Sequence, residues 1–433
     1  MKTPLKPDMF NVVALDQLRA MLGGQIQLKP VLAAEAQLEE HIDQFYGYEL
    51  SVDGILSELE TGEIDYQSLT ANGNEYTQPV VRLVGALLMD AVKRGVSDIH
   101  FEPEFAFLRI RYRIDGVLKQ VRSLHKSYWP GVAVRLKVVS GMDIAETRSP
   151  QDGRLNMNLC GRPIDFRVST HPTIHGENIV LRVLDREKSI IPLERMGLRA
   201  DTLAQLQLMM TRPEGILIVT GPTGSGKTTT LYSLLSHLND ETVNIMTLED
   251  PVEYRMSGVT QIQTHAEIGY TFARALRSIL RHDPDVIMIG EIRDLETAEI
   301  AVKAAQTGHM VLSTLHTNDA PQTISRLMNM GIAPFNIISS VTLVIAQRLA
   351  RRLHDCKRPQ TLPANALLAE GYTHEEIKAG ITLFEAVGCA DCNDGYKGRL
   401  GIYQVMPMTE EIQKIVLEGG NAMKIAEAAL ASG

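Results

Sequence analysis

The sequence has few cysteines, few aromatic residues and no long apolar run. Four cysteines among 433 residues are too few for the disulfide framework of a small extracellular protein. A single tryptophan and an aromatic content of 5% weigh against a protein that binds nucleic acid by base stacking. The longest apolar run, residues 215–219, falls far short of the ~18 residues that suggest a membrane-spanning helix. The first residues also lack the apolar core of a secretion signal, so we expect a cytoplasmic protein.

The charge balance gives no overall attraction to nucleic acid. With 43 basic and 52 acidic residues the net charge is −9, and we expect no nucleic-acid partner. An apolar fraction of 44% and a charged fraction of 22% are typical of a globular protein. At about 100–200 residues per domain, the length predicts two to four domains.

The residue pattern divides the chain into five parts. Residues 1–76 mix apolar and acidic positions and end in a polar stretch, which predicts a small helical domain and a linker. Residues 77–190 begin with a helical pattern and continue with alternating apolar and polar segments, which predicts an α+β domain. Residues 191–350 alternate short apolar strands with helices, the pattern of a parallel α/β core. We expect a cysteine-containing subdomain over 351–405 and a helical tail over 406–433.

The most specific motif is GPTGSGKT at residues 221–228. It matches the P-loop pattern GxxxxGK[ST] and lies between an apolar strand and a helical segment, the context that this motif requires. Glycines let backbone N–H groups turn toward phosphate oxygens at the positive end of a helix. We expect Lys227 to reach the β- and γ-phosphates of ATP and the Thr228 hydroxyl to ligate Mg²⁺. The predicted nucleotide-binding residues are Gly221, Pro222, Thr223, Gly224, Ser225, Gly226, Lys227, Thr228 and Thr229.

Carboxylates follow two of the expected core strands. The strand at 244–248 runs into Glu249, Asp250 and Glu253, and the strand at 286–289 is followed by Glu291. Ligands of open α/β sheets bind outside the carboxyl ends of the strands. The spacing therefore predicts that these carboxylates lie near the P-loop, where they would hold metal and orient water.

Two histidines bracket the next expected strand, at 310–313. His316 follows the strand and is expected near the nucleotide as a catalytic candidate, whereas His309 precedes the strand. Neither has a partner at metal-ligand spacing, so neither is predicted to bind a metal ion.

Together these motifs resemble the secretion ATPases that power type II secretion and type IV pilus assembly. That family carries, in order, a P-loop, an acidic box (here 247–253), a Walker B segment ending in Gly-Glu (here 290–291) and a histidine box (here 307–316). The preceding part of the chain matches the family in the segments SDIHFEP (97–103), RIRYRIDG (109–116), PQDGR (150–154) and DFRVST (165–170). The resemblance covers about residues 78–405 and implies a RecA-like P-loop NTPase core after an α+β, PAS-like domain.

The resemblance also implies roles for the polar residues. It implies a hexamer that binds ATP between its two domains, with Glu253 activating water and Glu291 as the Walker B acid that holds Mg²⁺. It further implies that arginines such as Arg111 and Arg113 act as arginine fingers at the γ-phosphate. Charge that develops on a transferred phosphoryl group needs cations beyond Lys227 and Mg²⁺. The alternative for these arginines is a strand with a solvated basic face.

The partners implied by the resemblance belong to a pilus or secretion machine. They are further copies of the chain, an inner-membrane platform protein and a cytoplasmic membrane-docking partner, which would place the chain at the inner membrane peripherally. The N-terminal domain and the cysteine region favour an assembly motor over a retraction motor. Two alternatives remain open: a nucleic-acid-translocating or conjugation-type P-loop motor, and a scaffold that binds ATP with little hydrolysis.

Three cysteines cluster in the last fifth of the chain. Cys389 and Cys392 form a CxxC pair, and assembly ATPases of the family usually carry a second CxxC about thirty residues earlier that completes a structural Zn²⁺ site. This chain has only Cys356 in that place, with His354 and Asp355 beside it as candidates for a fourth ligand. A zinc site and a metal-free remnant both remain open.

Overall fold

The computed structural model describes residues 5–6, 31–32, 52, 55–56, 79–185, 190–389 and 391–432. The chain forms two compact units, one made of Met1–Tyr112 and Lys119–Val183 and the other of Arg113–Leu118 and Leu184–Gly433. The short strands β1 (Leu5–Lys6) and β2 (Val31–Leu32) pair in parallel. The rest of the small helical domain expected over 1–76 lies almost entirely outside the described residues, so it stays a prediction.

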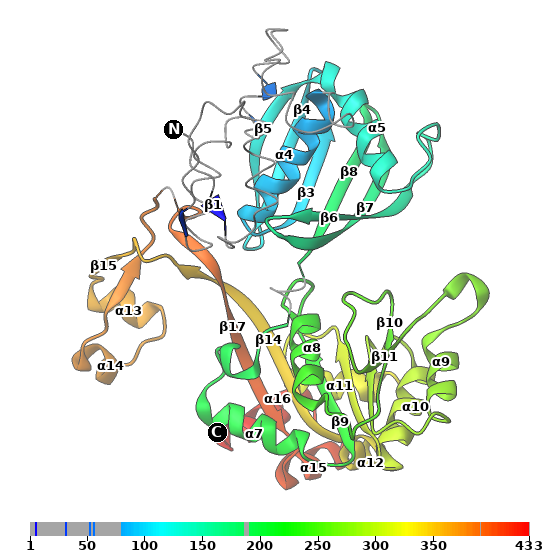
Figure 1. The fold of residues 1–433 in the computed structure, drawn as a ribbon. Helices are drawn as coiled ribbons and strands as arrows, with labels where there is room; N and C mark the ends of the chain where they lie inside the picture. The colour runs from blue at the N-terminus through cyan, green and yellow to red at the C-terminus, as the bar shows by residue number, and fades with distance from the viewer. Residues whose placement is uncertain are drawn as a thin grey trace. The chain divides into compact units, whose positions relative to one another are not determined.

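The first unit is a six-stranded sheet with two helices on one face (Figure 1). The sheet order is β5 (Val117–His125), β4 (Phe107–Ile114), β3 (Val96–Pro103), β8 (Gly176–Leu184), β7 (Arg162–Thr173) and β6 (Gln151–Leu159). The helices α4 (Pro79–Lys93) and α5 (Trp129–Val139) pack against each other, and a 3-10 turn, η1 (Lys126–Tyr128), precedes α5.

Strand β4 shows why this sheet has one apolar and one basic face. Leu108, Ile110 and Tyr112 are buried, whereas the alternate positions carry arginines and are partly exposed. Because side chains of a strand alternate between the two faces, the arginines share the face opposite the helices. The alternation predicted for this strand is thus observed.

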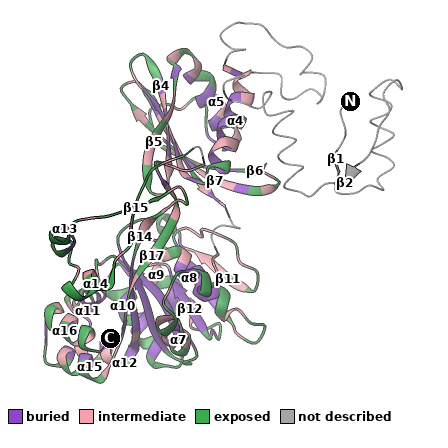
Figure 2. Ribbon diagram, turned by 90° about the vertical axis from the view of Figure 1, so that its left-hand side faces the viewer, coloured by how far each residue is buried: buried purple, intermediate pink, exposed green. Residues whose placement is uncertain are grey.

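The second unit is built on a seven-stranded sheet whose central strands are parallel. Its order is β11 (Val259–Gln263), β10 (Ile245–Glu249), β12 (Val286–Ile289), β13 (Met310–Leu315), β9 (Gly215–Thr220), β14 (Val341–Leu353) and β17 (Tyr396–Pro407). Only the last strand, β17, runs antiparallel to its neighbour. Four of the central strands are buried over their whole length, as Figure 2 shows in purple, which explains their continuous apolar sequence.

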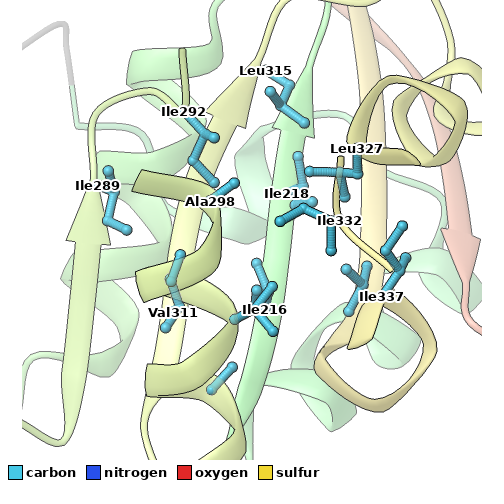
Figure 3. Close-up of a cluster of buried hydrophobic side chains, with 14 of the residues drawn as sticks. Ile216, Ile218, Ile289, Ile292, Ala298, Val311, Leu315, Leu327, Ile332 and Ile337 are labelled. Atoms are coloured by element: carbon cyan, nitrogen blue, oxygen red, sulfur yellow. The ribbon is translucent and has the colours of Figure 1, made fainter. Parts of the chain in front are cut away.

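Helices cover both faces of this sheet. On one face lie α9 (Phe272–Ile279), α10 (Leu295–Gln306), α11 (Ala320–Asn329), α12 (Pro334–Ser340), α15 (Glu410–Leu417) and α16 (Ala422–Ala431). On the other lie α7 (Ala200–Met210) and α8 (Lys227–Leu238). Strand β9 contributes to the apolar core on each face of the sheet. Ile216 and Ile218 lie in the first core, on the face covered by α9–α12, α15 and α16 (Figure 3), and Leu217 and Val219 lie in the second core, on the face covered by α7 and α8. The parallel α/β core predicted from the alternation of strands and helices is observed.

The parts expected beyond residue 350 are tied into this core. Strand β14 continues across the expected boundary and pairs with β17 from Leu343 to Leu353. Ile412, Val416 and Ile425 of the last two helices are buried in the first core. The expected boundary at 350/351 therefore falls inside a strand, because composition changes there while backbone pairing does not.

Small elements complete the second unit. Between β14 and β17 lie β15 (Arg358–Gln360), β16 (Leu383–Glu385), α13 (Ala364–Ala369) and α14 (His374–Ala379). Two 3-10 turns are η2 (Leu193–Arg195) and η3 (Ala266–Ile268). Within the described part of the chain, no helix has the length and apolar character needed to cross a bilayer.

Candidate functional site

The P-loop connects β9 to α8 through backbone conformations that glycine favours. Gly221, Gly224 and Gly226 have φ values of 143°, 79° and 91°, in the region that other residues rarely adopt. A Cβ on Gly221 would overlap the backbone oxygen of Gln347. Gly226 is the N-cap residue that directly precedes α8, so the N–H groups of the loop lie at a helix N-terminus, where anions are favoured.

Gln347 on β14 holds the P-loop through its side-chain amide, and the sequence motifs did not predict this role. Its side chain is 3% exposed, and its Nε2 donates to the Ser225 carbonyl at 2.7 Å. Its Oε1 accepts from the Thr230 hydroxyl of α8 at 2.7 Å. One buried amide therefore holds both the loop and the first turns of the helix. The available sign was a glutamine directly after the apolar run 343–346.

Lys227 lies at the start of α8 with its ammonium group turned toward the loop. Its Nζ donates to the carbonyls of Gly221 at 2.8 Å and Pro222 at 3.2 Å. Partial burial lowers the pKa of Lys227, and the negative charge of Glu291 opposes that shift. The structure thus brings Lys227 and Glu291 within electrostatic reach of each other.

The loop residues fit a phosphate and its metal ion. Among the residues that the structure describes, the buried Ser225 hydroxyl has no hydrogen-bond partner. Thr228, in the first turn of α8, is exposed, as are Pro222, Thr223 and Gly224, whereas Thr229 is half-buried. An orphan hydroxyl and an exposed hydroxyl beside a lysine are groups that phosphate oxygens and Mg²⁺ satisfy.

Glu291 follows β12 and lies beside the side chains of Arg293 and His316. The Arg293 guanidinium donates to its Oε1, and His316 Nε2 lies 3.3 Å from its Oε2. Partial burial would raise the pKa of Glu291, but the hydrogen bond and charge of Arg293 and the neighbouring His316 lower it below the ordinary carboxyl value. Glu291 is therefore ionised at neutral pH. Arg293, which also lies 3.8 Å from Asp250, was given no role in the sequence analysis.

Capped helices fix the loops that carry Glu291 and His316. The Asp294 carboxylate accepts from Thr297 N–H at the start of α10, and Asp319 accepts from Gln322 N–H at the start of α11. Each loop is therefore short, running from the end of its strand to a capped helix. His309, in contrast, lies before β13 with its Nδ1 2.9 Å from the Ala304 carbonyl.

The acidic residues at and after the end of β10 lie in different surroundings. Glu253 is half-buried in the segment between β10 and β11. Glu249, the last residue of β10, is 4% exposed and its carboxylate accepts from the Tyr232 hydroxyl of α8 at 2.5 Å. The expectation that Glu249 holds metal or orients water is therefore corrected, because protein donors already occupy its carboxylate. Alternation along β10 turns its side chain into the sheet face that α8 covers.

The arginines of β4 are held by acids on their own sheet. Arg111 pairs with Glu102 of β3, and Arg109 lies 3.0 Å from Glu102 and 2.6 Å from Glu104. Burial alone would raise the pKa of Glu102, but the hydrogen bonds and charges of Arg111 and Arg109 lower it below the ordinary carboxyl value. Arg113 donates to the Gly116 carbonyl at 3.1 Å. Carboxylates thus order Arg109 and Arg111 on this face, whereas Arg113 is held by a backbone carbonyl.

The cysteine cluster forms a compact set of four candidate ligands. The ligand atoms of His354, Cys356, Cys389 and Cys392 all lie within 4.8 Å of one another. Cys389 Sγ is 3.4 Å from His354 Nδ1 and 3.6 Å from Cys392 Sγ. Three thiols and one imidazole are a ligand set that suits tetrahedral Zn²⁺. His354 and Asp355 were the two candidates for the fourth ligand, and the cluster contains His354 and not Asp355.

Comparison with known proteins gives the family. The model of the family described as type II/IV secretion system protein matches residues 74–433. The chain is 46% identical to the type IV pilus assembly ATPase PilB of Acinetobacter baylyi, over 97% of this chain and 73% of the relative. It is also 46% identical to type II secretion system protein E of Aeromonas hydrophila, over 80% of this chain and 69% of the relative.

Solved structures agree with the fold. The pilus retraction motor PilT, solved with bound ADP, is 27% identical, has a TM-score of 0.53 and covers 79% of this chain and 87% of its own. The ATPase DotB of Legionella pneumophila has a TM-score of 0.60 over 82% of this chain and 88% of its own, at 22% identity. The predicted RecA-like P-loop core is thereby confirmed. The chain belongs to the type II/IV secretion system protein family, and it is an ATPase of that family.

Proposed function

We propose that the chain is the ATP-hydrolysing subunit of a homo-hexameric motor that powers pilin or pseudopilin assembly. The observation that carries this proposal is the gathering of Lys227, Glu291 and His316 at the carboxyl ends of neighbouring parallel strands. A lysine at a P-loop beside an ionised carboxylate is what binding and cleavage of a nucleoside triphosphate require. Relatives named as pilus assembly ATPases support the assembly role.

Hydrolysis requires water to attack the γ-phosphorus while the bond to the β–γ bridging oxygen breaks. The Glu253 carboxylate takes the proton of the attacking water, and the electron pair of the broken bond stays on ADP. Lys227 and the loop N–H groups hold the β- and γ-phosphates. Thr228 and Glu291 would hold Mg²⁺, which neutralises charge on the phosphates when bound. His316, beside Glu291, orients that carboxylate.

The arginines of β4 supply the remaining positive charge. Arg111 and Arg113 act on the γ-phosphate as arginine fingers, which are worth about 10³–10⁵ in turnover in P-loop enzymes. Support for Arg111 comes from Glu102, whose carboxylate holds the guanidinium groups of Arg109 and Arg111 on one sheet face, and Arg113 lies on the same face of β4.

We also assign a structural Zn²⁺ to His354, Cys356, Cys389 and Cys392. His354 directly follows β14 and the CxxC pair shortly precedes β17, so the ion would clamp the open ends of two paired strands. Backbone N–H groups of Cys389 and Gly395 lie 3.1 and 3.3 Å from Cys392 Sγ. Such N–H donors stabilise a metal-bound thiolate.

The partners and location follow from the same proposal. The motor works at the cytoplasmic face of the inner membrane, bound to a platform protein and to a membrane-docking partner. Nucleic acid is not a partner, since the net charge of −9 disfavours contact with phosphate backbones. ATP turnover stimulated by DNA with a steep salt dependence would favour the nucleic-acid motor instead.

The decisive experiment compares ATP turnover of two carboxylate variants with a matched control. Glu253→Gln removes the proposed base and is expected to slow turnover by about 10²–10⁴-fold with ATP still bound. Glu291→Gln is expected to slow turnover and to weaken its dependence on Mg²⁺. Glu296→Gln, on the exposed side of α10, should turn over as the unaltered chain does.

Three results would each contradict a part of the proposal. Wild-type turnover in Glu253→Gln would remove the assigned base, and slow turnover by the unaltered chain itself would support the ATP-binding scaffold. Analytical ultracentrifugation with a non-hydrolysable ATP analogue tests the assembly, since a monomer under those conditions would exclude the hexamer.

A further inference from the structure

Glu249 is a buried acid that the proposed hydrolysis does not use. Three donors surround its carboxylate: the Tyr232 hydroxyl at 2.5 Å, the Thr247 hydroxyl at 2.7 Å and Gln261 Nε2 at 3.2 Å. A buried carboxylate is tolerated only when such donors replace water. Both carboxylate oxygens of Glu249 therefore accept hydrogen bonds from protein side chains.

One of these donors, Gln261, also holds both ends of the segment 249–256. Gln261 on β11 donates to the Tyr254 carbonyl at 2.7 Å and accepts from Met256 N–H at 2.7 Å. Glu249 begins the segment and is itself bonded to Gln261. Glu253 therefore lies in a short span of chain that one glutamine side chain holds at both ends.

The network also reaches the P-loop helix. Tyr232 follows Lys227 by five residues in α8, and its hydroxyl lies 3.3 Å from both the nitrogen and the carbonyl oxygen of Tyr254. The Tyr232 and Tyr254 rings meet edge to face, with centroids 5.6 Å apart. Burial and the charge of Glu249 raise the pKa of Tyr232, so its hydroxyl stays protonated as a donor.

We propose that Tyr232, Glu249 and Gln261 are positioning residues that set Glu253 relative to the phosphates held by α8. The helix that carries Lys227 and the segment that carries Glu253 are joined through one buried carboxylate, so their separation is fixed before ATP binds. This inference rests on the proposed role of Glu253. A base displaced by about 1 Å loses on the order of 10²-fold in rate.

The test is ATP turnover by Tyr232→Phe, which removes one hydroxyl and keeps the ring contact. The expected result is a 10- to 100-fold fall in kcat with the KM for ATP and the affinity for a fluorescent ATP analogue unchanged within about twofold. Tyr403→Phe is the matched control, since that hydroxyl also makes one bond to a carbonyl, at 3.2 Å from Met196, but lies on β17. It should retain wild-type kcat.

A double variant separates positioning from simple structural damage. In single-turnover measurements, adding Tyr232→Phe to Glu253→Gln should cause no further loss, because both changes remove the same contribution. If Tyr232→Phe does not fold, Thr247→Val removes another donor to Glu249 without altering α8 and should show the same kcat loss.

The outcomes distinguish this inference from the proposed function. Wild-type kcat in Tyr232→Phe, an additive loss in the double variant, or a loss of ATP affinity as large as the loss of kcat would each overturn the positioning role. Wild-type turnover in Glu253→Gln would instead overturn the assignment of the base. Loss in Glu253→Gln together with wild-type kcat in Tyr232→Phe would sink only the positioning role.

Discussion

Replacing Gln347 by leucine should separate the P-loop from the sheet beneath it. The side chain is 3% exposed and makes two hydrogen bonds of 2.7 Å, to the Ser225 carbonyl and from the Thr230 hydroxyl. Leucine is similar in volume but leaves both groups buried without partners. At about 1–3 kcal/mol for each abandoned group, we expect the free energy of unfolding to fall by about 2–5 kcal/mol.

The consequence for function is weaker nucleotide binding. Because Ser225 lies within the loop and Thr230 within the first turns of α8, losing both bonds frees the backbone N–H groups that face phosphate. Titration with a fluorescent ATP analogue measures the affinity, and thermal unfolding measures the stability. Gln404→Leu is the matched control, because that exposed glutamine on β17 accepts only from Ala320 N–H, at 3.0 Å, in the described structure.

A conservative variant makes the reasoning refutable. Gln347→Glu keeps an acceptor for Thr230 but loses the donor to Ser225 and places a negative charge beside the loop, so we expect a larger loss of affinity than of stability. If Gln347→Leu binds the analogue as tightly as the unaltered chain does, the buried amide does not organise the loop.

Three further predictions address the remaining groups. Arg293→Gln removes the cation that lowers the pKa of Glu291, so the pKa rises toward its ordinary value and activity should be lost at a higher pH on acidification, as a pH profile of kcat would show. Arg111→Ala should reduce kcat by about 10³-fold at unchanged ATP affinity, whereas Arg182→Ala on a nearby strand should not, and equal effects in both would contradict the finger. Cys389→Ser should lower the zinc content measured by mass spectrometry of the native protein, and unchanged content would contradict the four-ligand site.

The sequence was sufficient to predict the elements whose pattern is local. The apolar segment predicted at 286–289 coincides with β12 (Val286–Ile289), and the P-loop pattern placed its glycines where positive φ values occur. In both cases the chemistry of adjacent residues dictates the conformation. Apolar character, periodicity and glycine positions are enough to predict an element when the interactions that form it are between residues close together in the chain.

Contacts between distant residues could not be predicted in this way. Gln347 bonds a residue 117 positions away, and β17 rejoins the sheet after a long excursion through the cysteine region. The orientation of the Glu249 side chain was also not predicted. A run of acidic residues at the end of a strand does not show toward which face of the sheet the side chain of the last strand residue points. The glutamine that directly follows the apolar run 343–346 was the one available sign of such contacts.

The strand β14 relates the two candidate sites without merging them. Gln347 supports the P-loop, and His354 of the cysteine cluster follows it by seven residues. At about 3.3 Å per residue, that separation is about 23 Å along the strand, too far for a metal ion to act on a phosphate. Pairing of β14 with β17 from Leu343 onward holds Gln347 independently of the cluster. Metal removal should therefore lower the unfolding temperature while the affinity for ATP is kept, and an equal loss of both would show that the strand transmits the state of the cluster to the loop.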